Sequence, residues 1–186
     1  RVVLNAISHL GVETEHAAIN KVIEIAIETA LRKGKELSDI SFNAKIDGVD
    51  YTIFELDGVD VAHVSRTKNI IYIGSDAVKT IAKAYGVSEV IASEALIRHE
   101  YTEKKSLLSQ LARRIGSSDP QEIKAFLDDP ANVSENLSFY IRGHAVGLAA
   151  EAGFILSRVS SSAAAQQTLD AVVDRTRTSY QRERGI

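Results

Sequence analysis

The chain has 186 residues, of which 45% are hydrophobic and 25% charged, and a formal net charge of −3. These values are typical of one globular domain spanning 1–186, and the near balance of charge argues against a protein that binds nucleic acid. No apolar run approaches the ~20 residues that a membrane span requires. The chain has no cysteine, which excludes disulfides, thiolate zinc sites and cysteine nucleophiles. It begins at Arg1 and contains no methionine, which suggests a processed N-terminus. We expect a soluble protein, with the cytoplasm as the favoured compartment and the oligomeric state left open.

The N-terminal third predicts one helix followed by a small sheet. Apolar residues recur at helical spacing over about 12–35, where Gly34 provides a stop. The segment 40–73 contains Asp47-Gly48 and Asp57-Gly58 between runs rich in Val, Ile, Tyr and Phe, which is the pattern of β-hairpins. We expect an antiparallel β-meander with strands near 40–46, 50–56, 59–65 and 69–73.

The remainder of the chain has a helical pattern. Helices are expected at about 76–85, 88–114 (with Ser106 as a potential break), 134–158 and 163–183. A further helix starts at Asp119-Pro120, which supplies an N-cap and a first helical residue. The last helix carries arginines among acidic residues, which predicts a solvated helix: Arg175, Arg177, Arg182 and Arg184. The expected fold class is therefore α+β and mostly helical, with the meander (40–73) packed against a helical part (75–160) and a C-terminal helix (about 163–183).

Polar side chains interrupt the apolar stripe of the helix over 88–106. His99 and Glu103 continue the stripe that Ala92 and Leu96 begin, and they are separated by one helical turn. This spacing lets one helix supply two ligands to a single metal ion. Glu100 points about 100° away from His99 around the helix axis, where a carboxylate can act on water without ligating the metal.

A second helix, over 134–158, contains a similar interruption. His144 lies in the apolar stripe between Ile141 and Leu148, and Glu151 follows two turns later. His144 is a candidate for a third metal ligand, because histidine is a common zinc ligand. Gly143 and Gly147 flank the histidine and allow another backbone or a ligand to come close. The alternative is a core histidine that is hydrogen-bonded to a carboxylate such as Glu103.

The segment "LIRHEYTEK" resembles the active-site helix of zincin metallopeptidases, whose HExxH motif supplies two zinc ligands and a general base. The similarity covers about 69–105 and includes the preceding strand "NIIYI" and helix "DAVKTIAKAY". Glu103 stands where the family has its second histidine, and carboxylate is an accepted zinc ligand. The resemblance implies zinc held by His99 and Glu103, with a glutamate of a downstream helix, here Glu151, as a third ligand. Because His144 is the better third ligand by chemistry, we expect His99, Glu103 and His144 to bind zinc, with Glu151 as an alternative ligand or outer carboxylate. The resemblance also implies Glu100 as general base, Tyr101 or Tyr140 as a candidate to stabilise an oxyanion, and a peptide or protein substrate.

Two functions are therefore compatible with the sequence. The first is a metal-dependent hydrolase of zincin-like type, a peptidase or a descendant of one. The second is a non-enzymatic helical interaction domain, in which the same polar residues form a buried His–Glu network that fixes the register of the helices. Metal content of the purified protein distinguishes the two.

Overall fold

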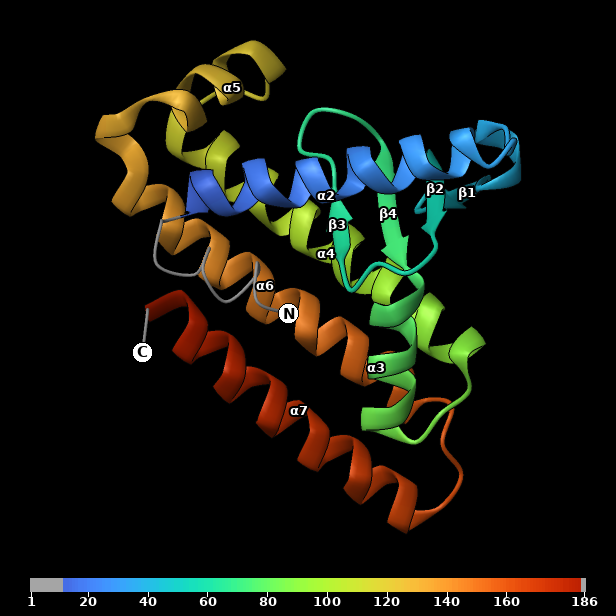
Figure 1. Ribbon diagram of the computed structural model, residues 1–186. Coiled ribbons are helices and arrows are strands. Elements are labelled where there is room, and N and C mark those ends of the chain that lie inside the picture. Colours follow the sequence, from blue (N-terminus) through green and yellow to red (C-terminus); the bar gives the residue numbers. More distant parts are fainter. Residues whose placement is uncertain (1–11, 185–186) are drawn as a thin grey trace.

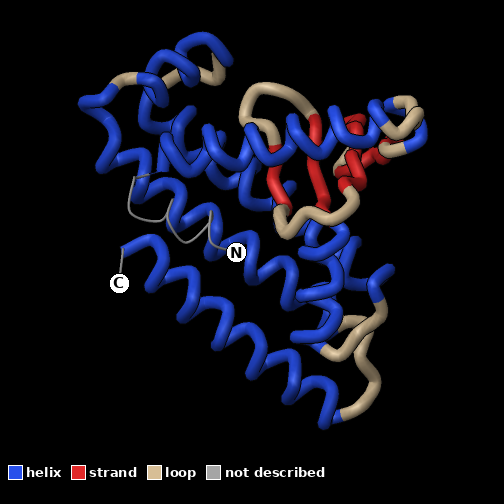
Figure 2. The backbone as a smooth tube through the Cα atoms, viewed as in Figure 1, coloured by secondary structure: helices blue, strands red, loops and turns tan. Residues whose placement is uncertain are grey.

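The computed structural model describes residues 12–184 and shows a small sheet held between helices (Figures 1 and 2). The helices are α2 (Val12–Arg32), α3 (Ser75–Tyr85), α4 (Glu89–Ile115), α5 (Pro120–Asp128), α6 (Val133–Leu156) and α7 (Ser162–Arg184). The strands are β1 (Ser41–Ile46), β2 (Val49–Leu56), β3 (Ala62–Val64) and β4 (Ile70–Gly74), and short 3₁₀ turns lie at η1 (Leu37–Asp39) and η2 (Pro130–Asn132). The predicted α+β class, mostly helical with a small sheet, is confirmed.

The sheet is mixed, and its strand order is β1-β2-β4-β3. β1 and β2 are antiparallel, β2 and β4 are parallel, and β3 pairs antiparallel with β4. The strand order of the predicted meander is therefore wrong. Ile71 and Ile73 of β4 are 0% and 2% exposed, and a strand that is apolar enough to be covered takes a central position in a sheet.

The two Asp-Gly pairs behave differently. Asp47 and Gly48 have φ of 49° and 81° and join β1 to β2 in two residues, as a type I′ turn requires. Gly58 also has a positive φ, 69°, but Asp57 does not. The second pair therefore forms no two-residue hairpin. The Gly58 N–H instead donates to Oγ of Ser75, at 2.9 Å, which ties this loop to the start of α3.

Helices cover both faces of the sheet (Figure 1). The α2 helix lies on one face, where Ile23 packs with Leu56 and Val61. The opposite face presents Ile53 and Ile71 to the main core, which α3 and α4 complete. Because successive side chains of a strand point to opposite faces, this small sheet separates two apolar clusters.

The α4 helix is long and unbroken, so the potential break near Ser106 is absent. Ser88 caps its N-terminus by accepting a hydrogen bond from the Ile91 N–H, and Gly116 ends it with a φ of 80°. Buried Leu107 and Leu111 continue the apolar stripe past Ser106 and give that part of the helix its own packing. The α4 helix therefore runs alongside α6 for most of the length of both helices (Figure 1).

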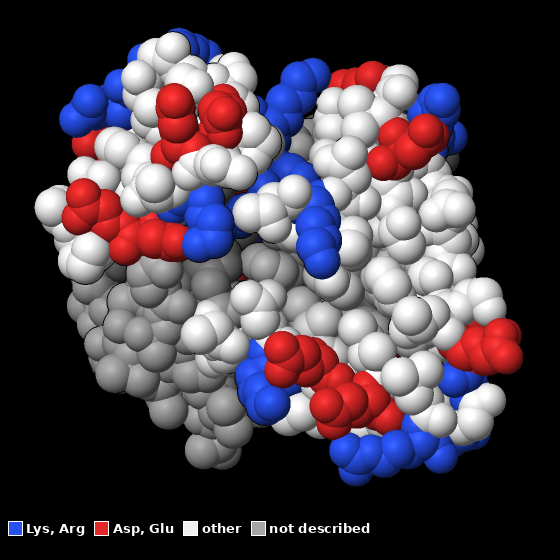
Figure 3. All heavy atoms as spheres, turned by 90° about the horizontal axis from the view of Figure 1, so that it is seen from above, with Lys and Arg blue, Asp and Glu red and all other residues white. Residues whose placement is uncertain are grey.

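Acidic and basic side chains alternate on the face seen from above, without gathering into one basic stripe (Figure 3). This pattern is in keeping with the small net charge of −3. None of the helices in the described part of the chain combines the length and the apolar character needed to cross a bilayer.

Candidate metal centre

Two glycines of α6 let this helix approach α4 closely. A Cβ on Gly147 would lie 2.8 Å from Cδ2 and 3.0 Å from the carbonyl oxygen of His99, and one on Gly143 would lie 3.3 Å from the carbonyl oxygen of Glu103. Any larger residue at position 147 would push against the His99 ring. The expectation that these glycines permit a close approach is confirmed, and the partner is the α4 backbone.

The close approach brings His99, Glu103 and His144 together as the sequence predicted. Nε2 of His99 lies 3.2 Å from Oε2 of Glu103 and 3.2 Å from Nδ1 of His144. Nδ1 of His144 lies 3.0 Å from the same Glu103 oxygen. One nitrogen or oxygen from each side chain thus forms a nearly equilateral triangle, which we call the His–Glu–His triangle.

The triangle has the dimensions of one face of a tetrahedral metal site. Ligand atoms about 2.0–2.1 Å from a tetrahedral zinc ion lie about 3.3 Å from one another. The three observed separations are 3.0–3.2 Å, so these side chains could hold a metal ion. The two histidine rings, with centroids 4.8 Å apart, are well within the range of a shared ion.

Glu151 lies on the other side of His99, outside the triangle. Its Oε2 is 2.7 Å from Nδ1 of His99, the ring nitrogen that does not face Glu103. A carboxylate in this position fixes the tautomer and the orientation of a metal-binding histidine. Glu151 therefore lies outside the group of side chains that could hold a metal ion and contacts His99 from the opposite side of the ring.

Tyr85 and Arg175 hold Glu151 in turn. The Tyr85 hydroxyl donates to Oε1 of Glu151 at 2.6 Å, and Nη2 of Arg175 donates to Oε2 at 3.0 Å. Nε of Arg175 also lies 2.8 Å from Oε1. The Glu151 side chain is fully buried, and a buried carboxylate requires such partners.

The sequence interpretation missed both of these residues. Arg175 was expected on a solvated helix, but its side chain is only 27% exposed. A signal was available, because Arg175 continues at helical spacing a stripe on α7 that includes buried Thr168 and half-buried Ala171 and Val172. Tyr85 had no such signal, since an aromatic residue near the end of an apolar helix is normally core.

The protonation of the cluster is strongly perturbed. Burial lowers the pKa of the His99 imidazole, but the Glu103 and Glu151 carboxylates outweigh this effect and raise it to about 10. Burial would raise the pKa of Glu103 and Glu151, yet hydrogen bonds from the histidines, and for Glu151 the Arg175 charge, hold both below their usual value. Both sets of shifts favour the charged form of the His99 imidazole between two carboxylates.

Glu100 is the second unusual carboxyl of α4. It is 7% exposed, and its carboxylate has no hydrogen-bond partner among the residues that the structure describes. Burial and the negative charge of Glu103 raise its pKa to about 8. A buried carboxyl with such a shift beside a candidate metal site is typical of a functional group.

Solvent reaches the triangle from the His144 side. The side chains of His144 and Glu103 are 31% and 17% exposed, whereas that of His99 is 3% exposed. A small cavity of about 20 Å³ adjoins Glu103 and is also lined by His63 and Tyr140. Tyr101 is the second tyrosine that the sequence suggested as a candidate to stabilise an oxyanion. Its hydroxyl donates to Asp47 in the β1–β2 turn, at 2.8 Å, and so contacts the sheet.

The comparisons with known proteins add no assignment. No protein-family model matches the chain, and no curated protein or solved structure shows significant similarity to it. The functional interpretation therefore depends on the geometry of the cluster and on the chemistry of its side chains.

Proposed function

We propose that this protein is a metal-dependent hydrolase of zincin-like type, a peptidase or a descendant of one, with zinc held by His99, Glu103 and His144. The observation that carries the proposal is the His–Glu–His triangle, whose three sides measure 3.0–3.2 Å. Two nitrogens and one carboxylate oxygen form an accepted donor set for a catalytic zinc ion, which keeps a further position open.

Hydrogen bonds alone satisfy this triangle poorly. If both histidines donate to Oε2 of Glu103, the two N–H groups also face one another across the 3.2 Å between Nε2 of His99 and Nδ1 of His144. Only two sides of the triangle can then be good hydrogen bonds. A cation at the centre interacts favourably with all three atoms at once, which is why we favour metal binding over a structural network.

The remaining residues have roles that follow from their positions. Glu151, held by Tyr85 and Arg175, orients His99 through Nδ1. When bound, zinc supplies a Lewis acid that polarises a carbonyl group and activates water. Glu100 would serve as the general base, and the charge of a bound cation would lower the pKa of its carboxyl toward the range that a general base needs.

The His144→Ala variant tests the proposal. His144 is the most exposed of the three side chains, so the variant should fold. The parent protein should contain zinc when purified without added metal or chelator, and added zinc should raise its melting temperature. His144→Ala should lose both properties, whereas the control variant His63→Gln, which changes a histidine outside the triangle, should keep them.

A structural His–Glu network is the competing function, and one observation favours it. Every atom of the triangle already has a polar neighbour in the absence of an ion, so the cluster can stabilise the α4–α6 contact by itself. This alternative predicts that His144→Ala lowers the melting temperature while neither zinc nor chelator affects the parent protein. That result would overturn the metal-dependent hydrolase.

A further inference from the structure

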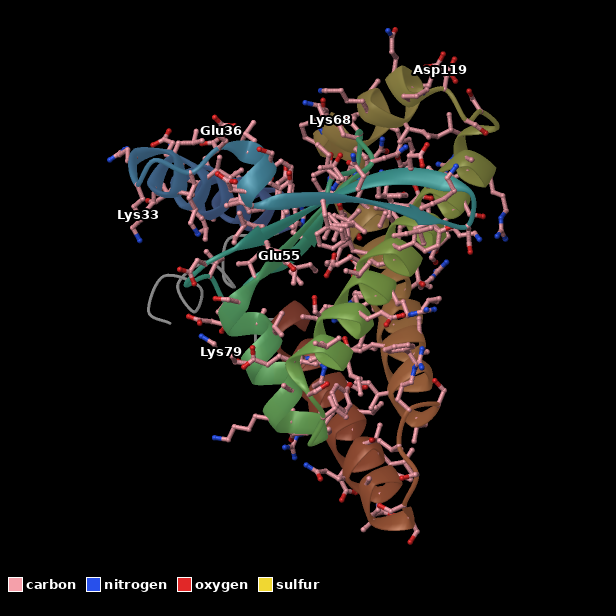
Figure 4. All side chains as sticks on the ribbon, turned by 90° about the vertical axis from the view of Figure 1, so that its right-hand side faces the viewer. Lys33, Glu36, Glu55, Lys68, Lys79 and Asp119 are labelled. Carbon is pink, nitrogen blue, oxygen red and sulfur yellow. The ribbon has the colours of Figure 1, made fainter. Side chains whose placement is uncertain are left out.

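A groove of about 730 Å³ lies between the sheet and the first turns of α3 and α4. Ile97 of α4 lines it, and His99 follows two residues later, about 200° around the helix axis. The groove therefore opens on the side of α4 away from the His–Glu–His triangle, and the proposed hydrolase does not use it. Figure 4 looks onto this side and shows Glu55 between the segment after α2, which carries Lys33 and Glu36, and α3, which carries Lys79.

Seven of the fifteen residues that line the groove are apolar. Four of its side chains belong to the buried core and form the floor: Ile40, Leu56, Ile73 and Val78. Two more remain accessible to solvent, since Phe42 is 43% exposed and Val90 is 78% exposed. Phe42 comes from the edge strand β1 and Val90 from the first turn of α4, so apolar side chains border the groove on both sides. Exposed apolar residues that gather at one concave site indicate a binding surface.

The polar lining of the groove is predominantly acidic. It contains five carboxylates and a single lysine: Asp39, Glu55, Asp57, Glu89, Glu94 and Lys35. Glu94 pairs with Arg98 at 2.8 Å, but no ion pair is formed by Glu55 or Glu89 within the described residues. Carboxylates around a low-dielectric surface concentrate their field in the groove and attract a cationic ligand.

We infer that this groove binds a basic peptide segment of a partner protein. Apolar side chains of that segment would insert between Phe42 and Val90, and its lysines or arginines would lie against Glu55 and Glu89. Charge complementarity selects this occupant, because an acidic or neutral segment would gain only the apolar contacts. The volume of about 730 Å³ lies within the range of about 300–1,000 Å³ that is typical of ligand-binding clefts, and it can take several side chains of a peptide.

Fluorescence anisotropy with three labelled 12-residue peptides tests the inference. The probe alternates leucine and lysine, and the two control peptides replace lysine with glutamate or leucine with serine. We expect the leucine–lysine probe to bind with a dissociation constant below about 100 μM, and each control peptide to bind at least tenfold more weakly. A failure of the leucine–lysine probe to bind at millimolar protein, or equal binding of the leucine–glutamate peptide, overturns the inference.

Matched variants locate the binding. Val90→Lys adds a positive charge at the groove, and Val173→Lys adds the same charge on α7, where Val173 is 69% exposed. A double variant, Glu55→Gln with Glu89→Gln, removes two carboxylates from the groove. Its control, Glu24→Gln with Glu28→Gln, removes two carboxylates from α2. The groove variants should weaken binding at least fivefold, and the controls less than twofold. If a groove variant and its matched control weakened binding equally, the peptide would not bind in the groove. If the parent protein formed a dimer that Val90→Lys abolished, the groove would bind a second copy of the chain instead of a peptide partner.

Discussion

Oε2 of Glu151 lies 2.7 Å from Nδ1 of His99, on the side of the ring opposite to Glu103. One imidazole therefore connects two carboxylates from two different helices. Glu151 also gathers Tyr85 from α3 and Arg175 from α7, so three helices determine the orientation of a single side chain of α4. In the proposed metal centre, this arrangement means that residues outside the triangle set the affinity for zinc.

Tyr85→Phe should weaken zinc binding without removing a ligand. The variant keeps the buried ring and deletes the hydroxyl that donates to Glu151 at 2.6 Å. Loss of an outer-shell hydrogen bond typically lowers metal affinity about tenfold or more. Competition with a chromophoric chelator measures the change, and Tyr101→Phe, which deletes the hydroxyl bonded to Asp47, serves as control. Equal zinc affinities of Tyr85→Phe and the parent would show that Glu151 does not act on the metal.

Gly147→Ala and Gly153→Ala should have opposite effects, although both lie within α6. Helix propensity alone favours alanine over glycine by about 1 kcal/mol at either position. A Cβ at position 153 meets no atom within 4 Å, whereas one at position 147 would lie 2.8 Å from Cδ2 of His99. We expect Gly153→Ala to leave the melting temperature unchanged or higher, and Gly147→Ala to lower both melting temperature and zinc content. A Gly147→Ala variant that keeps its zinc would show that the His99 ring can move without loss of the site.

Glu100→Gln separates catalysis from metal binding. The amide keeps the size of the side chain but cannot accept a proton, so hydrolysis of a fluorogenic peptide library should fall at least a hundredfold. Zinc content and fold should persist, because Glu100 is outside the triangle. A variant that loses its zinc would identify Glu100 as a ligand, and one that keeps full activity would remove it from the mechanism.

The sequence predicted the triangle because each of its members interrupts an apolar stripe. His99 and Glu103 interrupt the stripe of α4, and His144 interrupts that of α6, so periodicity indicated which faces would meet. It could not indicate how close the helices come, because that distance depends on the contact of Gly147 with the His99 backbone. The role of Glu151 stayed open for the same reason, since only the packed helices show which side of His99 it faces.

The sheet illustrates a different limit of sequence reasoning. Local turn chemistry was sufficient for the β1–β2 hairpin, whose Asp47-Gly48 turn has the predicted geometry. It was insufficient for β3 and β4, because the placement of β4 beside β2 pairs residues such as Ile53 and Ile71 that are distant in the chain. Strand order there depends on long-range pairing of β4 with β2, which turn chemistry does not encode.

Gly48→Val should destabilise the β1–β2 hairpin. Gly48 has a φ of 81°, and no atom lies within 4 Å of the position of an added Cβ, so the backbone conformation alone causes the cost. Forcing a branched residue into this region costs roughly 1–2 kcal/mol. Gly58→Val, at a φ of 69°, should cost a similar amount. Chemical denaturation measures both values, and unchanged free energies of unfolding would contradict the positive φ at these turns.

His63 should make the protein less stable as the pH falls from 6.5 to 4. The pKa of this imidazole is lowered from 6.5 to about 4, mainly by burial and further by the Arg66 charge. The Glu103 carboxylate acts in the opposite direction and raises it by less. The folded state therefore binds fewer protons at His63 than the unfolded state over this window. Stability rises with pH in such a case and falls on acidification.

The magnitude follows from the size of the shift. A lowering of the pKa from 6.5 to about 4 corresponds to a loss of about 3 kcal/mol of folding free energy between pH 7 and pH 4, at 1.36 kcal/mol per pKa unit. His63→Gln cannot bind this proton, so its free energy of unfolding should decline less steeply by that amount. Urea denaturation of both proteins at several pH values in EDTA measures the difference without a contribution from metal release. Carboxylates with lowered pKa values, such as Glu103 and Glu151, titrate in both proteins and largely cancel in the comparison. Parallel pH profiles would show that the buried imidazole accepts a proton in the folded state as readily as in the unfolded one.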